Sequence, residues 1–118
     1  MGVLFVNPEL SHRLTIGIEQ LEEFCQRRQV IELALFGSIL REDFGANSDI
    51  DILVTFQPDS KVSLLDLVDM QYELEGLLHR KVDLLTKKSV LNSSNWLRRK
   101  AILETAEVIY ESRSNLPN

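Results

Sequence analysis

Three aspartates stand where chemistry with metal ions and phosphates is expected. Asp49 and Asp51 open an apolar run that extends to Phe56 and is typical of a β-strand with one buried face. Successive side chains of a strand point to opposite faces, so both carboxylates project to one side while the isoleucines between and after them project to the core. Asp83 holds a similar place in a later run, KVDLL. If the two strands pair, all three carboxylates converge.

Such a group of carboxylates requires a cation. Neighbouring carboxylates raise one another's pKa, and their repulsion destabilises the fold unless protons or metal ions offset it. Mg²⁺ prefers oxygen ligands and takes one or two carboxylates together with the phosphate oxygens of a substrate. Two ions about 4 Å apart can hold the attacking and leaving oxygens of a phosphoryl displacement. We therefore predict that Asp49, Asp51 and Asp83 are catalytic and bind two Mg²⁺ ions.

A Gly-Ser turn before these aspartates is expected to bind the phosphates. Gly37 permits a close approach of the backbone, and the start of a following helix directs N–H groups at an anion. The Ser38 hydroxyl adds a donor, and Arg41 lies one turn further along. Ser48, directly before the first aspartate, completes the predicted nucleotide-binding residues.

Each motif alone is most often an ordinary turn or a solvated surface, and only their order along the chain is specific. The segment FGSILREDFGANSDIDILV with KVDLL resembles the signature of the polymerase-β-type nucleotidyltransferases. It is most similar to the minimal nucleotidyltransferases, or MNT proteins, from about Ile31 to Glu111. The resemblance implies a palm-like fold, Mg²⁺ with ATP as substrate at these motif residues, and catalysis through all three aspartates, which are present.

The resemblance also implies a partner. MNT proteins are commonly paired with small helical HEPN toxins and act as antitoxins, which implies transfer of AMP to a tyrosine of the toxin. Two alternatives stay open: an antitoxin that neutralises its toxin by binding alone, and transfer to a small molecule. No base-recognition element identifies the nucleotide. A neighbouring reading frame for a short helical protein would favour the toxin hypotheses.

The apolar pattern predicts the elements that position these residues. It favours an α/β (α+β) class, a small mixed β-sheet with helices packed on one face. The last strand is expected at an edge of the sheet. The predicted helices are 7–29, 38–43, 63–79 and 89–105, and the predicted strands are 31–36, 49–56, 81–86 and 107–111.

Composition limits the remaining possibilities. A chain of 118 residues with 44% hydrophobic residues is expected to form one domain over 1–118, with a flexible tail at 112–118. The net charge of −5 argues against direct nucleic-acid binding, and no run is long enough to span a membrane. A single cysteine forms no intrachain disulfide, and together with the absence of an export signal this favours the cytoplasm.

Four other features are assigned ordinary roles. His79 is expected at the end of a helix, Cys25 in the packing of the first helix, and Trp96 in the core rather than at a partner interface. The basic run 98–100 is expected to form a solvated helix face, with contact to RNA or a partner as the alternative.

Overall fold

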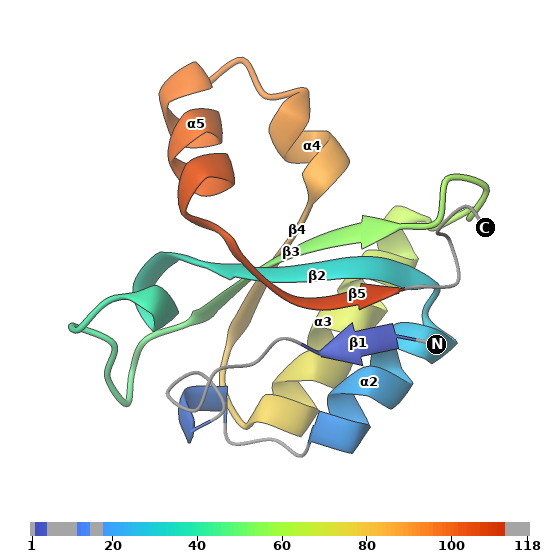
Figure 1. Ribbon diagram of the computed structural model, residues 1–118, viewed down its shortest axis with the longest axis horizontal. Helices are drawn as coiled ribbons and strands as arrows, with labels where there is room; N and C mark the ends of the chain where they lie inside the picture. Colours follow the sequence, from blue (N-terminus) through green and yellow to red (C-terminus); the bar gives the residue numbers. More distant parts are fainter. Residues whose placement is uncertain (1, 5–11, 15–17, 113–118) are drawn as a thin grey trace.

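The computed structural model describes residues 2–4, 12–14 and 18–112, and its five strands form one mixed sheet in the order β1-β5-β2-β3-β4 (Figure 1). All neighbouring strands are antiparallel except β3 and β4, which are parallel. The strands are β1 (Gly2–Leu4), β2 (Val30–Phe36), β3 (Ile50–Phe56), β4 (Val82–Thr86) and β5 (Glu107–Ser112). The expected fold class is therefore confirmed.

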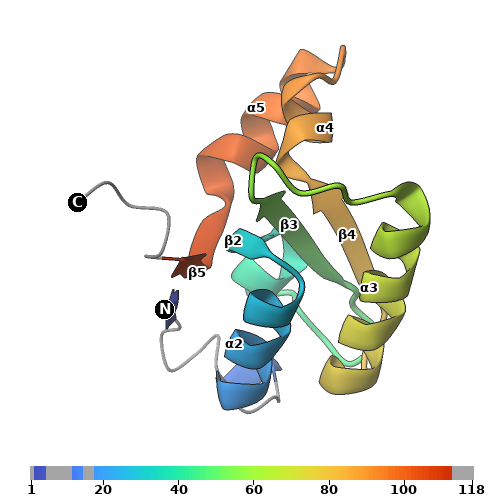
Figure 2. The ribbon, with the colours of Figure 1, turned by 90° about the vertical axis from the view of Figure 1, so that its right-hand side faces the viewer.

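Helices lie on both sides of this sheet (Figures 1 and 2). Helices α2 (Ile18–Arg27) and α3 (Leu64–Leu78) cover one face. The short α4 (Lys87–Leu91) and α5 (Trp96–Thr105) pack against part of the opposite face. The expectation of helices on one face thus holds for α2 and α3, and the α4–α5 unit is an addition to it.

The two faces have separate cores, and this division determines where the aspartates point. Ile50, Ile52 and Val54 of β3 pack with α2 and α3 in the larger core. Leu53 of the same strand packs with Ile102 of α5 in a smaller core. Side chains alternate along a strand, so Asp51 lies on the same face as Leu53. The functional face of the sheet is therefore the face that α4 and α5 leave partly uncovered.

Two predicted helices differ from the observed ones. The helix expected at 38–43 is a single 3₁₀ turn, η1 (Gly37–Leu40). The helix expected at 89–105 is divided into α4 and α5, because the side chain of Asn95 accepts a hydrogen bond from the backbone N–H of Arg98 at 3.1 Å and begins a new helix. Apolar periodicity alone does not reveal such a cap.

The last strand is also placed differently from the prediction. β5 is not an edge strand, because β1 pairs with its outer side while β2 pairs with its inner side. Ser112, the first residue of the expected tail, is the last residue of β5, and 113–118 lie outside the described residues. The helix expected at 7–29 is described only at 12–14 and in α2.

Three side chains with expected ordinary roles can be assessed directly. His79 ends α3 in the left-handed conformation, with φ of 56°, as expected for a helix end. Cys25 is fully buried, and burial raises the pKa of its thiol to about 12, which confirms a packing role. The prediction for Trp96 is wrong, because its side chain is 58% exposed at the start of α5.

No helix in the described part of the chain is long and apolar enough to cross a membrane.

Candidate active site

Neighbouring parallel strands bring the predicted aspartates together. Asp51 of β3 is in register with Asp83 of β4, and Asp49 immediately precedes β3. Asp49 and Asp83 are exposed, whereas Asp51 is half-buried. Burial raises the pKa of Asp51, and the negative charges of Asp83 and Asp49 raise it further. The structure thus places the three carboxylates within electrostatic reach of one another.

The Gly-Ser turn lies directly against the buried aspartate. Phe36, the last residue of β2, pairs with Asp51, and Gly37 then turns the chain with φ of 76°. A Cβ on Gly37 would overlap Oδ2 of Asp51 and would lie 3.0 Å from its Cγ. The Ser38 hydroxyl donates to the carbonyl oxygen of Asp49 at 3.3 Å. The glycine is therefore required both by the turn and by the close approach to the carboxylate.

The donor set fits a divalent cation that is completed by a substrate. Excess negative charge at Asp51 and its two neighbours is the arrangement that a cation offsets. Among the described residues, however, no three His, Cys, Asp or Glu side chains are close enough to form a ready-made metal site. Mg²⁺ commonly takes one or two carboxylates and obtains its other oxygens from water and phosphate. The residues present fit that second type of site.

A pocket of about 630 Å³ adjoins the Gly-Ser turn. One wall is η1 with the residue after it, through Gly37, Leu40 and Arg41. The other wall is α5, which contributes Arg98, Ala101, Ile102 and Thr105. The pKa of Asp51 is raised overall, and the positive charges of Arg41 and Arg98 offset part of that rise.

Comparison with known proteins identifies the family. A model of the nucleotidyltransferase domain matches residues 18–109. The chain belongs to this family. A protein of Methanocaldococcus jannaschii, named "Putative protein adenylyltransferase", is 39% identical over 71 residues, which cover 60% of this chain and 70% of the relative. Protein adenylyltransferase MntA of Thermococcus cleftensis is 39% identical over 82 residues, 70% of this chain and 78% of the relative.

Solved structures agree with the fold. The crystal structure of a toxin–antitoxin with AMP-PNP superimposes with a TM-score of 0.63 at 19% identity, covering 82% of this chain and 75% of that chain. The protein is thus a nucleotidyltransferase enzyme with protein adenylyltransferases among its relatives, and its resemblance to the minimal nucleotidyltransferases is confirmed.

The other two residues predicted to bind nucleotide, Arg41 and Ser48, form contacts within the protein. Arg41 lines the pocket, and its Nε lies 3.2 Å from a carboxylate oxygen of Asp43. The Ser48 hydroxyl accepts a hydrogen bond from the N–H of Gly45 at 3.0 Å, and so holds the loop that leads to Asp49. A role for either residue in binding nucleotide stays a prediction.

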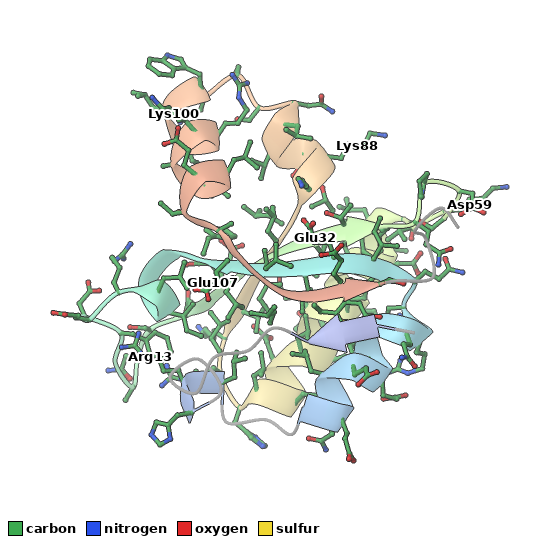
Figure 3. The ribbon with its side chains drawn as sticks, in the orientation of Figure 1. Arg13, Glu32, Asp59, Lys88, Lys100 and Glu107 are labelled. Atoms are coloured by element: carbon green, nitrogen blue, oxygen red, sulfur yellow. The ribbon has the colours of Figure 1, made fainter. Side chains whose placement is uncertain are left out.

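Arg98 is the site residue that the sequence reading did not select. The expectation of a solvated face for the run 98–100 holds for Arg98 and Lys100, which are both exposed. Arg98 also lines the pocket, whereas Lys100 lies elsewhere on α5 (Figure 3). The signal lies in the spacing: positions 98, 101, 102 and 105 follow the i, i+3, i+4, i+7 pattern of one helix face. That face can be assigned to the site only when the start of α5 and its packing are known.

Two further arginines hold the loop between the Gly-Ser turn and Asp49. The guanidinium of Arg80 lies 4.3 Å from the centroid of the Phe44 ring and donates to the carbonyl oxygens of Gly45, at 2.7 Å, and Ser48, at 2.9 Å. Arg13 lies 5.5 Å from the centroid of the same ring and donates to the carbonyl oxygen of Ile39 at 2.6 Å (Figure 3). The loop is fixed by contacts from two distant parts of the chain.

Replacing Arg80 with Ala is expected to loosen this loop and to displace Asp49. Loss of two hydrogen bonds and a cation–π contact should lower the melting temperature by about 4–8 °C. The displacement of Asp49 should lower the rate of transfer about tenfold. Thermal unfolding and steady-state kinetics measure the two effects. The neighbouring Lys81→Ala, which removes an exposed cation, is the control. Equal stability of Arg80→Ala and the control would show that the loop does not depend on Arg80.

Proposed function

We propose that this nucleotidyltransferase is an antitoxin that transfers AMP from ATP, with Mg²⁺, to a tyrosine hydroxyl of a HEPN-type helical toxin. The observation that carries the proposal is the cluster of three carboxylates, from Asp49, Asp51 and Asp83, beside the turn at Gly37. The toxin as acceptor is supported by the relative MntA, by the toxin–antitoxin neighbour that holds AMP-PNP, and by the resemblance to MNT proteins.

Each of these residues has a separate role in the transfer reaction, and its position on the sheet determines that role. Gly37 and Ser38 bind the β- and γ-phosphates, and Asp49 and Asp51 are the residues that would hold Mg²⁺ beside the α-phosphate. Bound Mg²⁺ supplies charge stabilisation at the phosphoryl oxygens. Asp83 lies on β4 in register with Asp51, and in this proposal the attacking hydroxyl approaches from that side. The hydroxyl oxygen forms a bond to the α-phosphorus as the bond to the bridging oxygen breaks, pyrophosphate leaves, and the hydroxyl proton passes to water or a carboxylate.

Positioning of the acceptor accounts for the need for a partner. Phosphoryl transfer is catalysed mainly by placing the reactants and stabilising charge, so an enzyme without a bound acceptor turns over slowly. Asp49 and Asp83 are exposed at the edge of this small chain, where a second protein can bring a hydroxyl to them. The substrate ATP and the single cysteine fit the cytoplasm as the compartment.

Intact-mass spectrometry of a reconstituted mixture tests the proposal. With its cognate toxin and MgATP, the protein should add one or more units of about 329 Da to a toxin tyrosine, as expected for AMP transfer. Toxin activity should fall in step with the modification. ATP alone should be consumed very slowly, and EDTA should abolish both nucleotide binding and transfer, because the carboxylates need the cation.

Two results would replace this proposal with its alternatives. Silencing of the toxin without any mass change would support an antitoxin that acts by binding alone. Transfer to a small-molecule hydroxyl, with the toxin left unmodified, would support the second alternative. ATP binding of equal strength with and without EDTA would contradict the role given to Mg²⁺.

A further inference from the structure

We propose that Gln71 and Glu75 of α3 are positioning residues for the transfer reaction. Their side chains hold β4 from its outer edge and so keep Asp83 in register with Asp51. The inference rests on the proposed function, in which the attacking hydroxyl approaches from the Asp83 side. Both residues act through the backbone of β4 rather than on a substrate.

β4 is held within the sheet on one side only. It stands at the end of the strand order, so that among the described strands only β3 pairs with it. This pairing is parallel, which is slightly less stable per residue than antiparallel pairing. The strand has five residues, and Asp83 is the second of them. The position of this carboxylate therefore depends on how firmly the edge of the sheet is held.

Two hydrogen bonds to α3 take the place of a neighbouring strand on the outer side. The backbone N–H of Val82 donates to Oε2 of Glu75 at 3.0 Å. The backbone N–H of Leu84 donates to Oε1 of Gln71 at 3.3 Å. Both bonds are partly buried, and Val82 and Leu84 directly precede and follow Asp83. We call these two hydrogen bonds the edge clamp.

The spacing of helix and strand suits this arrangement. Gln71 and Glu75 are four residues apart, so they lie on one face of α3 with a separation of about 6 Å along its axis. Val82 and Leu84 are two residues apart, which is about 6.6 Å along a strand. Their side chains pack in the larger core that α3 covers, and the helix lies beside the strand (Figure 2). Acceptors and donors therefore face each other at matching intervals.

Alternation along β4 links the edge clamp to the carboxylates. The side chains of Val82 and Leu84 point into the core, so Asp83 points to the opposite face of the sheet, the face of Asp51. The like charges of these two aspartates repel each other, which tends to push the edge strand away. Movement of β4 would displace Asp83 and leave the Gly37 turn and β3 in place. Loss of the edge clamp should therefore slow the chemical step without weakening the binding of ATP.

Paired substitutions separate the hydrogen bonds from the other properties of these side chains. Gln71→Met with Glu75→Met removes both acceptor oxygens and keeps flexible side chains of similar length. With the cognate partner and MgATP, this variant should have a kcat about tenfold or more below wild type, and a KM for ATP within about twofold of it. Gln71→Glu with Glu75→Gln keeps both acceptors and the net charge, and should restore the wild-type kcat. Glu104→Met, at an exposed position of α5, is the control and should match the wild type.

Hydrogen exchange tests the edge clamp without the partner. The amides of Val82 and Leu84 should exchange at least about tenfold faster in the double Met variant than in the wild type, because their acceptors are gone. The double variant Gln71→Glu with Glu75→Gln should exchange as slowly as the wild type. Thermal melts check that every variant folds.

Four results would contradict the inference. Unchanged exchange in the double Met variant would show that the edge clamp does not hold β4. Faster exchange with a wild-type kcat would show that the clamp does not position Asp83. A variant that keeps both acceptors but is as slow as the double Met variant would show that accepted hydrogen bonds are not the cause. If the wild type itself transfers no AMP to its partner, the proposed function fails and the positioning role fails with it.

Discussion

Replacing both Asp49 and Asp51 with Asn is expected to abolish AMP transfer while the fold is kept or made more stable. The amides cannot hold a divalent cation at the α-phosphate, so the rate should fall by at least about 10³-fold. The repulsion that Asp49 and Asp83 exert on Asp51 is removed at the same time. The melting temperature of the metal-free protein should therefore stay equal or rise.

Transfer is measured by intact mass of the partner, and stability by thermal unfolding with EDTA present. Asp59→Asn removes an exposed carboxylate from the loop after β3 and is the control, with wild-type activity and stability expected (Figure 3). A double variant that unfolds would assign the aspartates a structural role. A double variant that still modifies the partner would place the active site elsewhere.

Replacing Gly37 with Ala is expected to have the second largest effect. A methyl group there would overlap Oδ2 of Asp51, and the φ of 76° is one that residues with a Cβ rarely adopt. The backbone strain costs about 1–2 kcal/mol, and relief of the overlap requires the carboxylate to move. Because a shift of about 1 Å at a catalytic group can cost about 10²-fold in rate, activity should fall by that order.

Gly45→Ala provides a matched control on the same loop. An added Cβ at Gly45 would have only the carbonyl oxygen of Asp43, at 4.0 Å, as a near neighbour. This variant should keep wild-type activity and melting temperature. If Gly37→Ala is as active as Gly45→Ala, the close approach of the turn to Asp51 does not matter for catalysis.

The aspartate positions could be predicted because they depend on a local rule. Alternation along a strand places Asp49 and Asp51 on one side without knowledge of the fold, and the apolar run around Asp83 gives its strand. The register between Asp51 and Asp83 could not be read in this way, since it depends on β3 and β4 lying side by side. The identity of the three aspartates could thus be predicted from the sequence, whereas their convergence depends on the pairing of β3 with β4.

The sequence reading failed or was incomplete where features other than apolar periodicity decide the structure. The division of the last helix depends on the Asn95 cap, which apolar periodicity does not detect. Trp96 is exposed although aromatic side chains are usually buried, because α5 packs through Ile102 instead. Arg98 resembled its basic neighbours in sequence, and only the packing of α5 beside η1 distinguishes it.

The interior position of β5, between β1 and β2, affects the order in which the protein can assemble on the ribosome. β1 is made first, but it pairs only with β5, which is made more than a hundred residues later. Pairing between such distant segments closes a long loop and is slow to form. Until residues 107–112 have emerged from the exit tunnel, β2 presents an unpaired edge that can pair with other nascent chains. We therefore expect the sheet to be completed only after β5 has been released.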